Sequence, residues 1–315
     1  MSSWHQLDRQ QQGSCWWPCC GCTAVDLPMT FNGEVSTGDG RTTSTESYSI
    51  AGDAWSAEGN LSGRKAFSFT HDDCYIYSLG GDKSGTAFMS ETNKFYKSTK
   101  AWAADTAYPN GLTNIRIGGG DMAPASNGIN VFGGIKSGST FTTEHRALSS
   151  GSWSTLTATR LSVSRSTEAP GDGYVYLISG VSSTPSATSN VDQYDPSGDS
   201  FAAKTAMTAT RGNAAGVTDF SDKIAIIGGL DSGAAWTKKV YLYSISGDSW
   251  ATKTDCPSDT SHAPGMSAPS NTYVVAGQSD VSTIVSSLRE YSISGDSWAS
   301  RANTTIVKTR VGAAA

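Results

Sequence analysis

The stretch Tyr291-Ser-Ile-Ser-Gly-Asp-Ser-Trp298 has three near copies elsewhere in the chain. They are Tyr48-Ser-Ile-Ala-Gly-Asp-Ala-Trp55, Tyr194-Asp-Pro-Ser-Gly-Asp-Ser-Phe201 and Tyr243-Ser-Ile-Ser-Gly-Asp-Ser-Trp250. Two weaker copies end at Trp102 and Trp153, so six aromatic anchors follow one another at intervals of 47 to 51 residues: Trp55, Trp102, Trp153, Phe201, Trp250 and Trp298. A constant period of this length indicates a repeat architecture with one small structural unit per repeat.

Each of the last five anchors follows an apolar segment that ends in small residues. These segments are 75–81, 129–134, 174–180, 224–229 and 273–277. Glycine at the end of a strand permits positive φ, and the Gly-Asp step between the Tyr and the Trp predicts a tight hairpin turn. Each repeat is therefore predicted to form a small antiparallel sheet that buries its Tyr and Trp against the next repeat.

The order of these features resembles the kelch repeat: an apolar strand ending in Gly-Gly, then Tyr, then Trp about seven residues later. The resemblance covers roughly residues 29–315. It implies an all-β fold, a six-bladed kelch-type β-propeller, because radial closure leaves only short, protected edges. We assign residues 29–315 to the propeller and residues 1–28 to a Cys/Trp-rich N-terminal docking arm.

The two ends of the repeat region complement each other. After Trp298 the chain reaches Ala315 without another Gly-Gly strand, while residues 33–38 resemble residues 272–277 and lead to Tyr48 and Trp55 without an innermost strand before them. We therefore predict that residues 310–315 form the inner strand of the first blade, and that about residues 29–58 supply its other three strands.

Composition excludes some classes of partner. The net charge of −5 and the pI near 5.4 give no basic footprint for a nucleic acid. No apolar run approaches the length that a membrane span needs. Residues 1–12 are polar, so no standard secretory signal is predicted there, and localisation in a virion or cell-surface assembly is favoured over secretion by such a signal.

A basic residue follows each anchor by 9 to 14 residues: Arg64, Arg116, Arg165, Arg211, His262 and Arg310. Arg160 is a rival to Arg165 in its repeat. In the kelch family such arginines can line the mouth of the central channel, which implies a cationic rim that binds carboxylates or acidic sugars. The alternative is structural, because arginines repeated in every blade can tie the blades together through backbone carbonyls. The repetition favours this second interpretation.

Two kelch-like enzyme classes were tested against the residues. A copper-radical oxidase resembling galactose oxidase needs converging His and Tyr ligands, but His5, His71, His145 and His262 fall at unrelated phases of the repeat. An enzyme of the sialic-acid mutarotase kind needs acid and base groups at the channel, for which Glu144, Glu168 and Glu290 are candidates. The second class stays open as an alternative function.

The N-terminal segment concentrates unusual residues. Cys15, Cys19, Cys20 and Cys22 lie close to Trp4, Trp16 and Trp17. The thiols can hold a metal, form local disulfides, or stay free and pack with the tryptophans against a partner; their spacing is not that of the usual zinc knuckle. We favour the partner, with Trp4, Trp16 and Trp17 as docking residues. The isolated Cys74 and Cys256 are interpreted as small packed thiols.

The leading hypothesis is a non-catalytic binding or structural propeller without a cofactor. Its composition resembles kelch-like propellers of phage and viral particles and of microbial surfaces. We expect a component of a virion, such as a phage tail or fibre, or of a surface assembly, whose arm docks onto other protein subunits. The propeller would contact a neighbouring subunit or a surface glycan through aromatic residues between the second and third strands of their blades: Phe88, Phe141 and Trp236.

Overall fold

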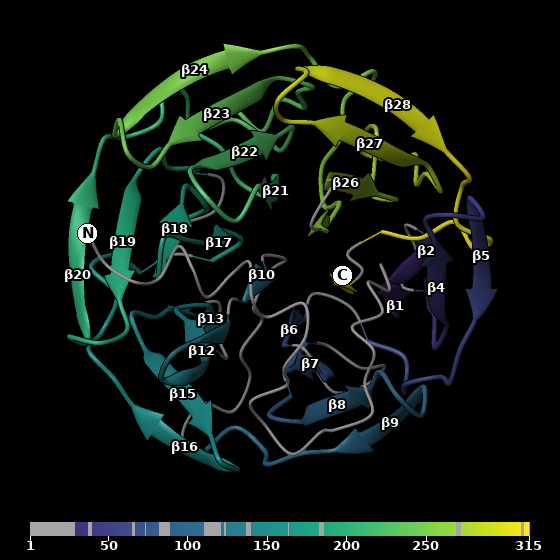
Figure 1. Ribbon diagram of the computed structural model, residues 1–315, viewed down its shortest axis with the longest axis horizontal. Helices are drawn as coiled ribbons and strands as arrows, with labels where there is room; N and C mark the ends of the chain where they lie inside the picture. Colours follow the sequence, from purple (N-terminus) through teal and green to yellow (C-terminus); the bar gives the residue numbers. More distant parts are fainter. Residues whose placement is uncertain are drawn as a thin grey trace.

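The computed structural model describes residues 29–36, 40–64, 67–72, 74–81, 89–109, 121–122, 124–136, 140–162, 164–182, 186–268, 272–309 and 312–314. All secondary structure in these ranges is β-strand. A search of the described residues finds no helix with the length and apolar character needed to cross a membrane. The described strands form five four-stranded sheets, one five-stranded sheet and two two-stranded hairpins, and the six larger sheets are arranged around a centre as a β-propeller (Figure 1). The predicted all-β propeller fold is confirmed.

The first three blades are described from the centre outwards. Blade 1 contains β29 (Gly312–Ala314), β1 (Met29–Phe31), β4 (Thr45–Ser49) and β5 (Ala54–Ala57). Blade 2 contains β6 (Ser68–His71), β7 (Tyr75–Leu79), β8 (Thr92–Tyr96) and β9 (Ala101–Ala104). Blade 3 contains β11 (Pro124–Ala125), β12 (Gly128–Phe132), β15 (His145–Ser149) and β16 (Ser152–Thr155).

The other three blades follow the same order. Blade 4 contains β17 (Thr167–Gly171), β18 (Tyr174–Ile178), β19 (Val191–Asp195) and β20 (Ser200–Lys204). Blade 5 contains β21 (Ala215–Thr218), β22 (Lys223–Ile227), β23 (Val240–Ser244) and β24 (Ser249–Lys253). Blade 6 contains β25 (Gly265–Ser267), β26 (Thr272–Val275), β27 (Leu288–Ser292) and β28 (Ser297–Arg301).

The inner strands close the ring. The strands β6, β10 (Asp121–Met122), β17, β21, β25 and β29 contact one another in this order, and β29 returns to contact β6. In addition, β10 pairs in parallel with β6 and becomes the fifth strand of that sheet. Two short hairpins, β2 (Glu34–Ser36) with β3 (Gly40–Arg41) and β13 (Ile135–Lys136) with β14 (Thr140–Phe141), lie between the second and third strands of blades 1 and 3.

The C-terminal strand completes the first blade as predicted. Strand β29 pairs antiparallel with β1, with Met29 opposite Ala314, and β1 pairs with β4 on its other side. One detail of the sequence interpretation is wrong, because residues 33–38 are not the counterpart of residues 272–277. The second strand of blade 1 is β1, and the segment after Gly33 enters the β2–β3 hairpin.

A pair of residues with positive φ ends the second strand of every blade. The pairs are Asn32–Gly33, Gly80–Gly81, Gly133–Gly134, Ser179–Gly180, Gly228–Gly229 and Ala276–Gly277. The second member is glycine in all six blades. A Cβ on Gly229 would lie 2.8 Å from the carbonyl oxygen of Gly212, so the close approach of two backbones requires glycine there. In the Gly-Asp turns, by contrast, the aspartate adopts the left-handed conformation, as at Asp53 and Asp248.

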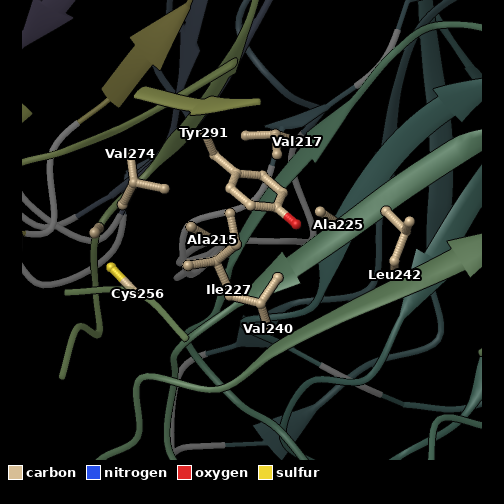
Figure 2. Close-up of a cluster of buried hydrophobic side chains, with 10 residues drawn as sticks. Ala215, Val217, Ala225, Ile227, Val240, Leu242, Cys256, Val274 and Tyr291 are labelled. Atoms are coloured by element: carbon tan, nitrogen blue, oxygen red, sulfur yellow. The ribbon is translucent and has the colours of Figure 1, made fainter. Parts of the chain in front are cut away.

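The repeated Tyr and Trp build the contacts between blades. Tyr291 of blade 6 is fully buried among Val217, Ala225 and Val240 of blade 5, together with other apolar residues of the cluster (Figure 2). Its cross-strand partner Trp298 packs at the edge of the same cluster. Burial of each such aromatic side chain contributes about 1.5–3 kcal/mol, so the core of the protein lies in the seams between blades.

An arrangement that we call the outer clamp joins the outer edges of successive blades. Asp248 of blade 5 accepts hydrogen bonds from the Tyr243 hydroxyl at 2.6 Å and from the backbone N–H of Thr205, at the end of blade 4, at 2.9 Å. The Trp250 indole N–H donates to the carbonyl of the same Thr205 at 2.9 Å. Equivalent aspartates contact the preceding blade at three further junctions: Asp53 with Ala302, Asp199 with Thr157 and Asp296 with Thr254.

Candidate functional site

One end of the ring collects the segments that could contact a ligand. Because neighbouring strands in a blade are antiparallel, the loop between the second and third strands and the crossing to the next blade meet at the same end. We call this end the loop face. It carries Trp236, in the loop between β22 and β23, and Phe141, in the β13–β14 hairpin; both are half-buried. Phe88 lies outside the described residues.

The predicted basic residues occupy two different structural positions. A residue in the first position accepts a hydrogen bond through its backbone carbonyl. The donor is the N–H of the glycine that ends the second strand of the preceding blade. Gly33 donates to Arg64 at 3.0 Å, and Gly180 donates to Arg211 at 2.7 Å. Thr260 and Lys308 hold the same position, as acceptors from Gly229 and Gly277. Arg64 and Arg211 are thus equivalent to each other, but not to Arg165 and His262.

Side chains at this first position point into the protein. Arg64 has an exposed fraction of 0%, and its guanidinium donates to the Gly80 carbonyl, to Glu91 and to Asn93. Burial lowers its pKa to about 10 despite the neighbouring Glu91. Arg211 is also buried and donates to the Thr210 carbonyl at 2.6 Å and to the Tyr241 hydroxyl at 3.3 Å. These contacts are structural, and a ligand-binding role for the two arginines stays an untested prediction.

Lys308 is a member of this set that sequence reasoning missed. It lies ten residues after Trp298, just as Arg211 lies ten residues after Phe201, whereas Arg310 was chosen for its better match to the inner strand. Lys308 is fully buried, and its ammonium contacts Glu46 at 2.5 Å. A strict comparison of spacings would have found it.

The second position forms what we call the αL arc: Arg165, Asn213 and His262. All three residues have positive φ, between 53° and 57°. The Asn213 N–H donates to the Arg165 carbonyl at 3.2 Å, and the His262 N–H donates to the Asn213 carbonyl at 3.1 Å. The backbone thus connects blades 4, 5 and 6 at the entry to their inner strands. Arg165 and His262 are half-buried, while Arg116 and Arg310 lie outside the described residues.

Two further features of the αL arc concern its side chains. The Trp236 and His262 rings lie 6.0 Å apart, so an indole from blade 5 stands beside the arc residue of blade 6. Asn213 is 7% exposed, and its amide nitrogen is buried without any hydrogen-bond partner. A buried amide without a partner costs free energy that a bound acceptor would recover. The arc therefore combines a guanidinium, an imidazole, an amide donor and an aromatic surface.

Glu168, on the inner strand β17 of blade 4, is the acidic group with the most unusual environment. Its side chain is buried and accepts a hydrogen bond of 2.5 Å from the Ser166 hydroxyl. Burial raises the pKa of this carboxyl group to about 8, with the Ser166 hydrogen bond acting in the opposite direction. The other two candidate acids form ion pairs with neighbouring arginines, Glu144 with Arg146 and Glu290 with Arg301.

The described residues offer no metal centre. Among them, no three His, Cys, Asp or Glu side chains lie close enough together to hold a metal ion. His145 is buried, with its ring nitrogens facing the Thr157 carbonyl and the Asn130 amide oxygen, and its pKa is lowered to about 4 by burial. Cys74 and Cys256 are free thiols. Cys15, Cys19, Cys20 and Cys22, with Trp4, Trp16 and Trp17, lie outside the described residues, so their predicted roles are untested.

Comparison with known proteins supports the fold. No family model matches the chain, and no curated protein matches it in sequence. In shape the chain is similar to a solved structure described as "Structure of YjhT", with a TM-score of 0.65 and 14% sequence identity over 80% of this chain and 87% of that one. At this identity the likeness shows the fold alone. The chain is thus a kelch-like β-propeller.

Proposed function

We propose that this propeller binds ligands without catalysis and that the loop face is its binding face. The observation that carries the proposal is the αL arc, where Arg165, Asn213 and His262 follow one another around the ring with Trp236 beside His262. Arg64 and Arg211, at the other repeat position, are buried and donate to groups inside the protein. In the αL arc Arg165 and His262 are half-buried, His262 Nδ1 lies 3.1 Å from the Ser261 hydroxyl, and the Asn213 amide nitrogen has no hydrogen-bond partner.

The chemistry of the arc favours a glycan that carries a carboxylate. A guanidinium forms paired hydrogen bonds with a carboxylate, and a half-buried imidazole and an amide donor can complete its coordination. An indole provides a flat apolar surface against which one face of a sugar ring can pack. A ligand with one anionic group and one such face matches the four side chains.

Membership of a larger assembly is the second part of the proposal. The low proportion of charged residues, 16%, and the richness in Ser, Thr and Gly resemble the composition of kelch-like propellers of phage and viral particles and of microbial surfaces. In this proposal residues 1–28 dock onto neighbouring protein subunits, and the propeller presents its loop face outwards. This part rests on sequence composition.

The test is direct binding to immobilised glycans, using sugars that end in sialic or uronic acids and neutral sugars of similar size. Trp236→Ala removes the indole. Arg165→Asn and His262→Asn remove the guanidinium and the imidazole while keeping a residue that Asn213 shows to fit this backbone conformation. Phe220→Ala is the control, because Phe220 is an exposed aromatic residue in the turn between β21 and β22, at the opposite end of the ring.

We expect binding of carboxylated glycans that weakens about tenfold or more in the three loop-face variants and is unchanged in Phe220→Ala, because each variant removes a directional contact worth about 1.4 kcal/mol or more. Binding that survives all three loop-face substitutions, or the absence of binding to every carboxylated glycan, would refute the proposal.

A second candidate function is a sugar-modifying enzyme of the sialic-acid mutarotase kind. The observation in its favour is Glu168, a buried carboxyl group with a pKa of about 8, three residues after Arg165. An acid with a pKa near neutrality can both donate and accept a proton under physiological conditions. Glu168→Gln removes this capacity and keeps the shape of the side chain, so an activity that disappears in this variant would favour the enzyme.

A further inference from the structure

Blade 2 differs from its neighbours at the junction with blade 1. Where blades 1, 4, 5 and 6 have the Tyr and the Asp of the outer clamp, blade 2 has Phe95 and Lys100, so the hydroxyl and the carboxylate are both replaced. Lys100 instead contacts Glu58 of blade 1 at 2.6 Å. The Lys100 side chain is 49% exposed and the Glu58 side chain is 7% exposed, and Glu58 also accepts the Ser47 hydroxyl at 2.6 Å. Salt screens an ion pair whose cation reaches solvent, so this pair is more sensitive to ionic strength than the clamp hydrogen bonds.

The charges at this junction are reversed relative to three of the four clamped ones. At three clamped junctions a basic residue lies three positions after the anchor of the preceding blade. These residues are Lys204, Lys253 and Arg301. Three residues after Trp55 the chain has Glu58, which meets Lys100. Trp102 keeps its indole N–H hydrogen bond, but to the Thr45 hydroxyl of blade 1.

The junction between blades 2 and 3 lacks the clamp as well. Leu148 replaces the Tyr, and Ser150 and Gly151 form the turn, so the turn carries no carboxylate. The outer hydrogen bonds run from the Trp153 indole to the Thr106 carbonyl at 3.0 Å and from the Thr106 hydroxyl to the Gly151 carbonyl at 2.9 Å, while Tyr108 packs against Trp153 in the hydrophobic cluster of this seam. Blade 2 is therefore without the aspartate clamp on both sides.

Blade 2 also contains buried hydroxyl groups that lack hydrogen-bond partners. Four hydroxyl groups in its strands are buried without a hydrogen-bond partner: Ser68, Thr70, Ser78 and Thr92. Each such group loses its hydrogen bonds to water on folding and gains none, which costs about 1–3 kcal/mol. This cost is recovered when water reaches the hydroxyls, so it favours opening of this blade over opening of the others.

We propose that blade 2 opens locally while the other five blades stay closed. The weak outer junctions lower the cost of separating the blade, and the unsatisfied hydroxyls gain hydrogen bonds when it separates. Opening gives solvent and small polar molecules a path to the interior through this side of the ring. Because the lysine of the Lys100–Glu58 pair is exposed, salt weakens the pair and the extent of opening increases with ionic strength.

Hydrogen exchange followed by mass spectrometry on the full chain tests the proposal. The blade 2 strands β7 and β8 (residues 75–79 and 92–96) are compared with the equivalent blade 5 strands β22 and β23 (residues 223–227 and 240–244), at about 0.05 M and about 0.5 M NaCl. We expect the blade 2 segment to exchange at least tenfold faster and to accelerate with salt, while the blade 5 segment does not respond. Equal protection of the two segments at both salt concentrations would overturn the proposal.

Two variants, one that introduces the clamp residues into blade 2 and one that removes them from blade 5, provide a matched control. Glu58→Lys/Phe95→Tyr/Lys100→Asp gives the first junction the residues of a clamped one, and Tyr243→Phe/Asp248→Lys removes the clamp of blade 5. We expect slower exchange in blade 2 for the first variant and faster exchange confined to blade 5 for the second. Loosening of the whole ring by the second variant would contradict the idea that single blades open. If the first variant does not fold, the comparison of hydrogen exchange in blades 2 and 5 of the natural chain still tests the proposal.

Discussion

The ammonium group of Lys308 lies 2.5 Å from the carboxylate of Glu46, and both side chains are buried, 0% and 2% exposed. Glu46 belongs to the third strand of blade 1, whereas Lys308 precedes β29, the strand that closes this blade from the other end of the chain. Glu46 also accepts the Thr305 N–H at 3.0 Å. The pair therefore fixes the closing segment of the ring to the blade that it completes.

Removal of one partner of this pair should be strongly destabilising. Lys308→Met leaves a buried carboxylate without its cation, and we expect a loss of about 3–5 kcal/mol in the free energy of unfolding. The double variant Lys308→Met/Glu46→Leu should lose less than the single variant, because no buried charge remains. Denaturant unfolding measures both. A double variant that is less stable than Lys308→Met would contradict this account of the pair.

Deletion of residues 310–315 removes β29 and leaves the second strand of blade 1 with a free edge. We expect the shortened chain to lose cooperative unfolding or to unfold at a much lower denaturant concentration. A synthetic peptide with the sequence of residues 309–315 should restore part of the loss, because it can pair with β1. Unchanged unfolding of the shortened chain would show that the ring does not depend on this strand.

The outer clamp makes stability depend on pH in acid. The Tyr243 hydrogen bond lowers the pKa of Asp248, and the Ala302 N–H lowers the pKa of Asp53, ahead of the Tyr48 hydrogen bond. Their stabilising contribution is therefore present above the unfolded pKa of about 3.9 and is lost as the pH falls through the folded values.

We expect the natural chain to lose stability below about pH 4. Asp248→Asn should remove part of this dependence while it lowers stability at pH 7, and Tyr243→Phe should cost about 1 kcal/mol. Equilibrium unfolding across this pH range measures each effect. The clamp interpretation does not survive if Asp248→Asn and the natural chain have the same stability at pH 7.

Glu168 predicts a second pH dependence of opposite sign. Its folded pKa of about 8 lies above the usual value of about 4.3, so the folded state holds the proton more tightly than the unfolded state does. The stabilising effect is complete below about pH 4.3 and declines as the pH rises towards 8. Glu168→Gln should flatten the stability curve between these values. An unaltered curve in this variant would mean that Glu168 titrates normally.

The repeated features of the fold were accessible from the sequence. The anchors and the small-residue strand ends predicted the blades, because most blades pack against their neighbours through the same repeated residues. The closing strand could be predicted since residues 29–58 lacked an inner strand and the C-terminal copy ended early. The start of blade 1 could not, because Asn32 takes the place of the first small residue and only its positive φ shows the equivalence with Gly80.

The candidate site was less accessible. Arg64, Arg165 and Arg211 look alike in sequence. Arg165, however, lies two residues further along the segment between blades than Arg64 and Arg211 do. Its side chain is half-buried, whereas theirs are buried. Asn213 carries no charge and so escaped notice, although it is the backbone equivalent of Arg165 and His262. Glu168 was proposed as an acid, but its burial on β17 depends on how neighbouring blades pack.

The central claim, binding without catalysis at the loop face, can be tested most directly by nuclear magnetic resonance of a carbon-13-labelled carboxylated sugar mixed with the natural chain, with Trp236→Ala and with Glu168→Gln. The account predicts that the sugar resonances broaden with the natural chain and with Glu168→Gln, lose the broadening with Trp236→Ala, and show no faster interconversion of anomers with any of the three. Accelerated interconversion with the natural chain that disappears with Glu168→Gln would contradict it and establish the enzyme instead.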